Sequence, residues 1–175
     1  MMEEIWRFNA YDDRGISVKE FLKFVLAFVI TMKLIGLLFP VCIVKGQSMK
    51  NTLQDKDLVV LNRLSYFISE PKRKDIVIIN VDENNNSEIA GKTIVKRIIG
   101  LPGEKLEIKE NKIYINGEYI EEGYLYDDMI TPNIDVLIPL KEVFVMGDNR
   151  NKSGDSRDFG TFRVKDIEAK VLFKK

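Results

Sequence analysis

An almost uninterrupted apolar run from Phe21 to Phe39 constrains this chain of 175 residues more than any other feature. As an α-helix, these about 19 residues reach roughly 28 Å, which approximately matches the hydrocarbon core of a bilayer. Lys23 lies near one end of the run and can extend its amine to the membrane interface. Lys33 lies deeper in the run, so placing its charge in the bilayer costs more free energy. We therefore expect a membrane-spanning helix at about residues 18 to 38.

Other interpretations of this run fit the sequence less well. A cleavable signal peptide does not normally carry four acidic residues before its apolar stretch, and no small-x-small cleavage site follows the run. A lipoprotein would be processed at Cys42, but no small residue precedes that thiol. A buried core helix is disfavoured by the two lysines. Basic residues are few on both sides, so the charge rule leaves the orientation open.

The composition excludes several classes of site. The chain has no histidine, so a Ser-His-Asp triad is impossible, and a serine nucleophile would need a lysine or a terminal amine as its base. One cysteine and no histidine rule out the common zinc sites, and we expect neither a metal nor an organic cofactor. The balance of 27 basic and 27 acidic residues disfavours nucleic acid as a partner. A single cysteine cannot form an internal disulfide and does not settle the compartment.

After Pro40 the sequence changes to short β-branched runs separated by charged or Gly/Pro/Asn turns, which is typical of a mostly β domain. The runs are Leu58–Leu61, Ile76–Ile79, Thr93–Val95 and Val143–Val145. Asn116-Gly117, between the alternating segments of 112–120, predicts a hairpin with a type I′ turn. The polar stretch 82–88 predicts an exposed connection, and 124–133 a loop.

These patterns predict an N-terminal segment at 1–17 and a transmembrane anchor at 18–40. A β-rich domain at 41–175 follows, with a small excursion at about 104–141. The fold class that we expect is mostly β, a compact antiparallel sheet or barrel-like domain behind one transmembrane α-helix.

Two polar side chains stand out in this pattern. Ser48 lies in Gly46-Gln47-Ser48-Met49, about nine residues beyond the expected membrane exit, so its hydroxyl lies close to the bilayer surface if the anchor is real. Strand alternation places Lys96 on one face with Ile94 and Ile98. Burial among apolar groups lowers the pKa of a lysine, as a general base near neutral pH requires.

Purely structural roles of both residues remain open. Ser48 alone could be a turn or helix-capping serine, and Lys96 a solvated or salt-bridged strand lysine. Lys92, beside Gly91, lacks the apolar setting. Spacing alone does not bring Ser48 and Lys96 together.

The order of four elements makes the chain resemble the bacterial type I signal peptidases, also called leader peptidases, of the serine-lysine class. The resemblance extends from the apolar run to beyond Arg157. The elements are Ser48-Met49, Lys74–Val77, Lys96-Arg97 with the following Gly100–Glu104, and Gly147–Arg157. The short stretch between Gly103 and Val143 suggests a compact, Gram-positive-like enzyme.

The resemblance implies specific roles. Ser48 is expected to attack the peptide carbonyl, with Lys96 as its base. The family places a hydroxyl against the lysine amine, which maps to Ser153, and an acid-arginine pair that maps to Asp155 and Arg157.

The oxyanion hole is expected to differ from that of some members of the family. Those members offer a serine hydroxyl two residues before the nucleophile, where this chain has Gly46. The Ser48 N–H must then carry more of the oxyanion stabilisation, with a second main-chain donor.

We expect the segment before Ser48 to bind the substrate as a neighbouring strand. If it is extended, Cys42, Val44, Gly46 and Ser48 share one face, and Gln47 belongs to the same oxyanion and substrate-binding segment. Cys42 and Val44 would then line pockets for small side chains.

The expected reaction is the removal of signal peptides from exported preproteins after small residues, by a membrane-anchored serine endopeptidase through an acyl-enzyme. The expected partners are signal peptides and membrane lipid, and the oligomeric state is open. The resemblance implies that 41–175 is the catalytic domain, on the extracellular face of the cell membrane, and that the N-terminal segment 1–17 is cytoplasmic.

Two other functions compete. A serine-lysine self-cleaving repressor-type protease is soluble and carries a DNA-binding head in place of the apolar run. A membrane-tethered β domain could bind exported peptides without cutting them. Signal peptidases with histidine as base are incompatible with the composition.

Overall fold

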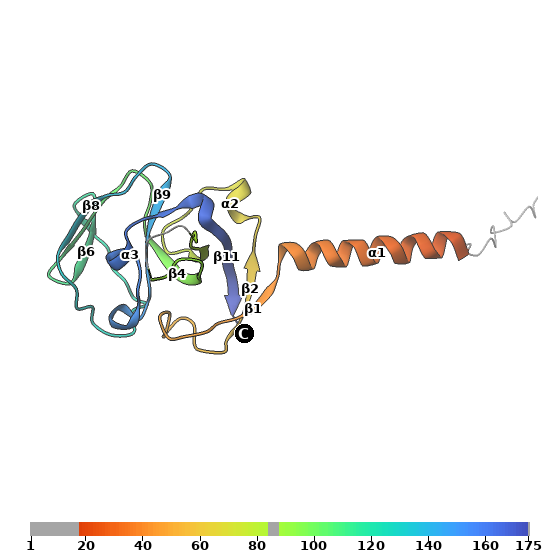
Figure 1. Cartoon of the computed structure of the whole chain (residues 1–175), viewed down its shortest axis with the longest axis horizontal. Helices are drawn as coiled ribbons and strands as arrows, with labels where there is room; N and C mark the ends of the chain where they lie inside the picture. Colours follow the sequence, from red (N-terminus) through yellow and green to blue (C-terminus); the bar gives the residue numbers. More distant parts are fainter. Residues whose placement is uncertain (1–17, 84–87, 175) are drawn as a thin grey trace, which may run out of the picture. The chain divides into compact units, whose positions relative to one another are not determined.

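The computed structural model describes residues 18–83 and 88–174 (Figure 1). The chain divides into two compact units, with the boundary between Leu37 and Leu38. The segment 1–17, expected to be cytoplasmic, lies outside the described residues, as do positions 84–87 of the expected exposed connection.

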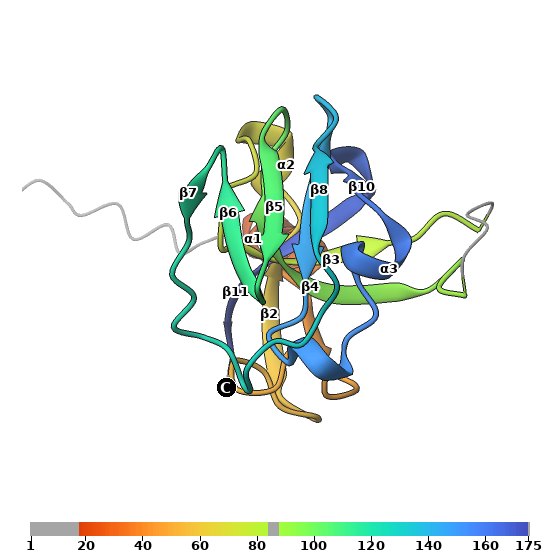
Figure 2. The same cartoon turned by 90° about the vertical axis from the view of Figure 1, so that its left-hand side faces the viewer.

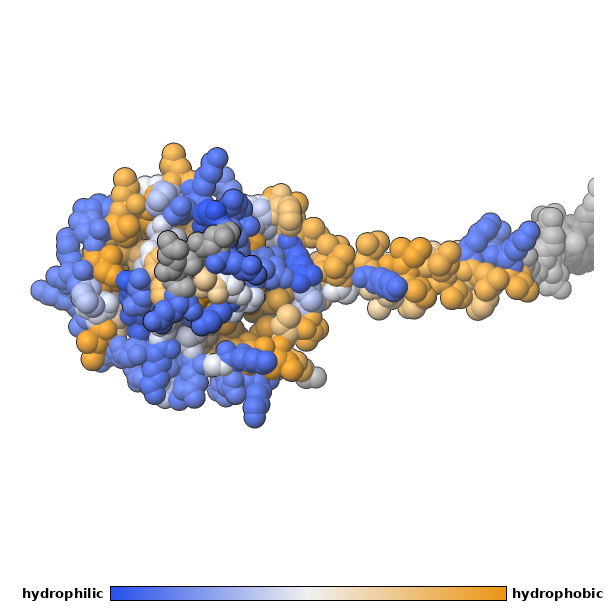
Figure 3. Space-filling model, in the orientation of Figure 1, coloured by the Kyte–Doolittle hydropathy of each residue, from blue (hydrophilic) through white to orange (hydrophobic). Residues whose placement is uncertain are grey.

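The first unit contains all but the last residue of helix α1, Val18–Leu38, which has the bounds expected for the apolar helix. The helix is 21 residues long, an 18-residue stretch of it has a mean hydropathy of 2.2, and none of its side chains is buried, unlike those of a core helix. Figure 3 shows that its surface is largely hydrophobic. By length and composition, α1 can cross a membrane.

The second unit is built around a seven-stranded sheet in which every neighbouring pair is antiparallel. The β-branched runs of the sequence lie in four of its strands. In spatial order the strands are β1 (Val41–Ile43), β2 (Leu58–Asn62), β11 (Ile167–Lys174), β3 (Ile76–Asn80), β4 (Thr93–Gly100), β9 (Glu142–Met146) and β10 (Phe162–Arg163).

The excursion forms a second, four-stranded antiparallel sheet, whose strands lie side by side in Figure 2. Asn116 and Gly117 have φ values of 52° and 86°, as the type I′ turn between β6 and β7 requires. Residues 124–133 form a loop before β8. The order of strands is β7 (Glu118–Tyr119), β6 (Lys112–Ile115), β5 (Lys105–Lys109) and β8 (Ile134–Leu137).

A buried cluster joins the two sheets. Ile99, Phe144 and Met146 of the large sheet pack against Leu106 and Ile108 of the small one. Full burial of each such side chain is worth about 1.5–3 kcal/mol. Two further clusters cover the large sheet, one around Val77 and Ile98 and one around Met49 and Val59.

Short helical segments complete the unit: α2 (Ser65–Ile68), η1 (Arg150–Lys152), α3 (Ser156–Phe159) and η2 (Val164–Asp166). The prediction of a mostly antiparallel β fold following one apolar helix is confirmed.

Candidate active site

Ser48 lies in a tight turn that follows β1. Met49 and Leu53, each 1% exposed, anchor this turn in the core cluster around Val59. Leu53 N–H donates to Met49 O at 2.7 Å, and Gly46 N–H donates to the carboxylate of Asp55 at 2.9 Å. The apolar anchors and these bonds hold the half-buried Ser48 at a fixed place on the surface of the sheet.

The expected extended segment from Cys42 to Ser48 is wrong beyond Ile43, where β1 ends. Gly46 has a φ of 96°, a left-handed conformation that glycine adopts without steric cost, and the chain turns there. Val44 is buried in the core cluster around Val59, whereas Cys42 is exposed, so these two side chains do not share one open face.

Lys96 lies on β4, whose neighbours are β3 and β9, and pairs with Val77 across the ladder. Ile94 and Ile98, the residues expected on its face, pack in the cluster around Val77. Lys96 is only 4% exposed, and its Nζ is 3.0 Å from Ser48 Oγ. The fold therefore brings together the serine and the lysine that the sequence singled out, while Lys92 is exposed.

The electrostatic surroundings of Lys96 are mixed. Burial is the largest influence and lowers the pKa of its amine below the ordinary lysine value. The negative charge of Asp155 raises this pKa, the positive charge of Arg157 lowers it, and Asp148 raises it more weakly. Because desolvation dominates, the equilibrium is shifted toward the neutral amine relative to an ordinary lysine, and a neutral amine can accept a proton.

Asp155 and Arg157 form the expected pair in a buried setting. Arg157 Nε and Nη2 each donate to the Asp155 carboxylate at 2.9 Å, and Asp155 is fully buried. Asp155 also accepts from the main-chain N–H of Gly147 at 2.9 Å and caps helix α3. This pair therefore fixes the segment that faces Ser48.

Ser153 lies beside the site without the expected contact. Its Oγ is buried and has no hydrogen-bond partner among the described residues, so it does not bind the Lys96 amine. A Cβ added to Gly147 would come closer than 3.0 Å to both Ser153 Oγ and Ser48 O. The hydroxyl thus occupies the space that the missing Gly147 side chain leaves open.

Sequence reasoning missed a second buried ion pair. Arg97 Nε and Nη2 donate to the Asp148 carboxylate at 2.8 and 2.6 Å, and Thr52 Oγ1 also donates to it. The Arg97 guanidinium lies 4.1 Å from the centre of the Tyr124 ring. Arg97 and Asp148 both belong to elements that the sequence singled out, but they are far apart in the chain and no local pattern pairs them.

A third pair ties the excursion to the site. Arg150 is 2% exposed and donates through Nη1 and Nη2 to Glu122, and its Nε donates to Gly147 O at 3.0 Å. Asn149 donates to Ser48 O and to Gln47 O. These residues were also missed, although all but Glu122 lie in or beside the singled-out elements.

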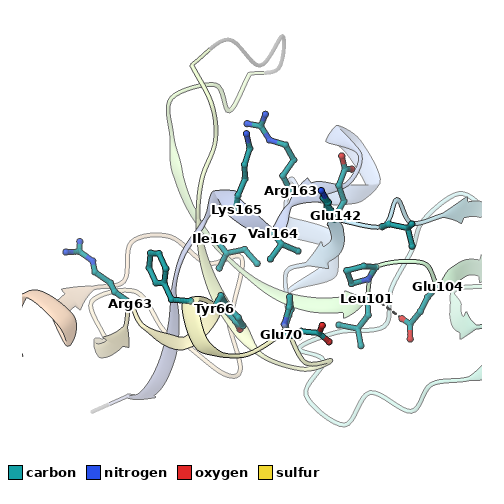
Figure 4. Close-up of a pocket in the computed structure, with 15 residues that line it drawn as sticks. Arg63, Tyr66, Glu70, Leu101, Glu104, Glu142, Arg163, Val164, Lys165 and Ile167 are labelled. Atoms are coloured by element: carbon teal, nitrogen blue, oxygen red, sulfur yellow. Dashed lines mark hydrogen bonds between the residues drawn. The ribbon is translucent and has the colours of Figure 1, made fainter.

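A cavity of about 1230 Å³ lies elsewhere on the β-rich unit (Figure 4). Its walls come from α2, the turn after β4, and the segments at 140–142 and 163–167, and they include Tyr66, Leu101 and Ile167. Neither Ser48 nor Lys96 lines it. At Ser48 and Lys96, by contrast, a hydroxyl lies beside an amine with a lowered pKa, which is the combination that marks a candidate active site. Among the described residues, no cluster of three or more thiol or carboxylate side chains is placed to hold a metal ion.

Known proteins are similar to this chain in sequence and in fold. The family model described as signal peptidase, peptidase S26, matches residues 18–174. Signal peptidase I S of Bacillus subtilis is 36% identical over 170 residues, which cover 90% of this chain and 88% of that protein. Signal peptidase I of Bacillus amyloliquefaciens is 38% identical over 160 residues, which cover 85% and 82%.

A crystal structure of a signal peptidase I from Enterococcus faecalis is similar in fold. Its TM-score is 0.51 at 32% identity, and the match covers 61% of this chain and 99% of that chain. The family match spans most of the chain, and two relatives are similar over most of their length. The chain therefore belongs to the signal peptidases I of family S26, the serine endopeptidases that remove signal peptides.

Proposed function

We propose that Ser48 is the nucleophile and Lys96 the general base of a serine-lysine dyad. The observation that carries this proposal is the 3.0 Å distance between Lys96 Nζ and Ser48 Oγ, with the lysine 4% exposed. A neutral amine at this distance can take the hydroxyl proton directly.

The reaction then runs in two halves. Ser48 Oγ attacks the carbonyl carbon of the scissile peptide while its proton passes to Lys96. The main-chain N–H of Ser48 donates to the oxyanion of the tetrahedral intermediate. Collapse of the intermediate breaks the C–N bond, and the leaving amine of the mature protein takes the proton from Lys96.

Hydrolysis of the acyl-enzyme repeats these steps with water. Lys96, neutral again, removes a proton from a water molecule that attacks the ester. A second tetrahedral intermediate collapses, the signal peptide leaves as a carboxylic acid, and its oxygen deprotonates into solvent. The Ser48 hydroxyl regains its proton from Lys96.

The supporting residues act through geometry in this proposal. Asp155 and Arg157 brace Gly147, whose main chain lies against Ser48 O. Ser153 Oγ lies against the same face of Gly147 as Ser48 O, and a change of rotamer would move its hydroxyl toward the reacting groups. Gly46 and Gln47, which precede Ser48, form the wall along which the substrate strand lies.

We further propose that α1 is a single-pass anchor, with the catalytic unit on the extracellular side. Its length and apolar surface suit a bilayer, and Leu38 leads after a short strand to Ser48. A signal peptide held in the same membrane would present its cleavage site close to the extracellular surface of the bilayer. Small side chains before the scissile bond would fit beside the exposed Cys42 and the glycine at position 46.

The test is cleavage of a panel of preproteins by the full chain in detergent or liposomes, with N-terminal sequencing of the products. Ser48→Ala and Lys96→Ala should each lower turnover about 10³-fold or more, because both groups act in the same step. Lys92→Ala is the matched control and should retain most activity, because Lys92 is exposed on the same β-hairpin. Substantial turnover by the Lys96 variant would refute the base assignment.

The cleavage panel, together with fractionation of the cell lysate, separates the competing functions. A tethered peptide-binding domain would bind the preproteins and leave them intact. A repressor-type protease would be found in the soluble fraction after lysis rather than with membranes.

A further inference from the structure

Asn149 contacts both of the peptide groups that flank Ser48. Its main-chain N–H donates to Ser48 O at 2.9 Å, and its side-chain Nδ2 donates to Gln47 O at 3.1 Å. Asn149 is 1% exposed, so packing restricts its side chain to this arrangement. Lys50 N–H also donates to Gln47 O from within the turn. Asn149 thus ties the turn of Ser48 to the Gly147–Arg157 segment.

The bond to Gln47 O has a consequence for Ser48 N–H. Gln47 C=O and Ser48 N–H belong to the same peptide group, which is trans and planar, so they point in opposite directions. A donor that fixes the direction of the carbonyl also fixes the direction of the N–H. Ser48 N–H donates no hydrogen bond to any residue of the ranges 18–83 and 88–174, and is therefore available to a ligand.

The other end of the Asn149 amide supports a positional role. Its Oδ1 is buried and has no hydrogen-bond partner among the residues that the structure describes. Burying an acceptor without a partner is unfavourable, and an apolar side chain of similar shape would avoid that loss. The part of the amide that this site uses is therefore the Nδ2 donor.

We propose that Asn149 is a positioning residue that aims the Ser48 N–H at the oxyanion of the tetrahedral intermediate. This inference rests on the proposed function, because it assigns a role only if Ser48 is the nucleophile. Asn149 touches no substrate atom in this proposal and acts through the Gln47–Ser48 peptide group alone.

The experiment compares the kinetics of the full chain in detergent with those of two variants, Asn149→Ala and Asn151→Ala. Asn151 is the matched control, because it is an exposed asparagine of the same segment that bonds to Asp128 O and Ile130 N instead. We expect Asn149→Ala to lower kcat about 10²-fold, near the lower end of the loss of one oxyanion donor, with KM changed less than about 3-fold. Asn151→Ala should leave both within about 3-fold of the wild type.

A second measurement separates oxyanion binding from general damage. A peptide aldehyde ending in alanine forms a hemiacetal with Ser48 and carries the oxyanion, whereas the matching peptide alcohol cannot react. For Asn149→Ala, affinity for the aldehyde should fall by the same factor as kcat/KM, and affinity for the alcohol should stay constant. An unchanged kcat, or a lower kcat with unchanged aldehyde affinity, would overturn the proposal.

Two further variants keep the test decisive. If Asn149→Ala does not fold, Asn149→Asp has nearly the same shape and places a carboxylate oxygen beside Gln47 O. In Asn149→Asp, kcat/KM and affinity for the aldehyde should again fall by the same factor. If they do not fall, the proposal is contradicted. Ser48→Ala separates the two levels of inference. Turnover by Ser48→Ala refutes the proposed function itself, whereas an inactive Ser48→Ala beside a fully active Asn149→Ala refutes only the role of Asn149.

Discussion

Removing the carboxylate of Asp148 should destabilise the β-rich unit by about 3 kcal/mol, because it leaves the Arg97 guanidinium buried without its counter-ion. The two side chains are 9% and 0% exposed, and Arg97 makes two hydrogen bonds to the carboxylate. Breaking one partner of a buried pair costs about 3–5 kcal/mol. We take the lower end because Arg97 keeps its bond to Lys74 O and its contact with Tyr124.

Thermal unfolding followed by the near-ultraviolet circular dichroism of the tyrosines measures this loss in detergent. For a chain of this size, about 3 kcal/mol lowers Tm by about 6–12 °C. Asp166→Ala is the control, because the Arg163–Asp166 pair has side chains 41% and 19% exposed and is worth less than about 1 kcal/mol. Equal Tm shifts in Asp148→Ala and Asp166→Ala would refute the reasoning.

A double substitution sharpens the same prediction. In Arg97→Met/Asp148→Leu, neither charge remains buried, so the double variant should lose less stability than Asp148→Ala alone. A double variant that is less stable than the single one would show that the pair contributes net attraction beyond the penalty of an unpaired charge.

Three further predictions concern the dyad and its surroundings. Gly147→Ala should lower kcat at least about 10²-fold, since the new Cβ would clash with Ser48 O and Ser153 Oγ. A chromogenic peptide assay measures this loss, and near-wild-type turnover would contradict the close packing around Gly147. Burial lowers the pKa of Lys96 in the folded chain below its ordinary value, which the unfolded chain keeps. Between these two pKa values the unfolded chain binds more protons than the folded chain, so the stability of the wild type contains a contribution that rises with pH in that window. Lys96→Met should lack this contribution, and its stability should exceed that of the wild type most below that window, as urea midpoints at several pH values would show. Arg157→Met leaves the Asp155 charge uncompensated and should raise the pKa of Lys96, which moves the rising limb of the pH–rate profile to higher pH. An unmoved limb would argue against that electrostatic link.

The features that depend on local periodicity could be predicted from the sequence, whereas those that depend on long-range contacts could not. The apolar helix, the strands and the Asn116-Gly117 turn follow from spacing and from residues that tolerate positive φ. Lys96 could be singled out because the residues two positions before and after it, which share its face of the strand, are isoleucines. The turn at Gly46 was missed because a glycine in a short segment is compatible with both an extended and a left-handed backbone.

The missed ion pairs have a common physical origin. Arg97 with Asp148, and Arg150 with Glu122, join side chains brought together only when the sheets pack. A charged residue in a sequence is usually solvated, and nothing in its neighbours indicates that it will be buried. The role of Asn149 is equally invisible, because it depends on the direction of one carbonyl group.

These pairs explain how the pKa of the Lys96 amine stays lowered beside two carboxylates. Asp155 and Asp148 would each favour the ammonium form of Lys96 if their charges were unopposed. Each is bound instead by its own arginine, through bidentate hydrogen bonds in a buried setting. Their fields at the lysine are therefore partly cancelled, and the desolvation of Lys96 decides the sign of its pKa shift. The two buried ion pairs thus hold the geometry of the site without reversing the lowered pKa that the proposed mechanism needs from the amine.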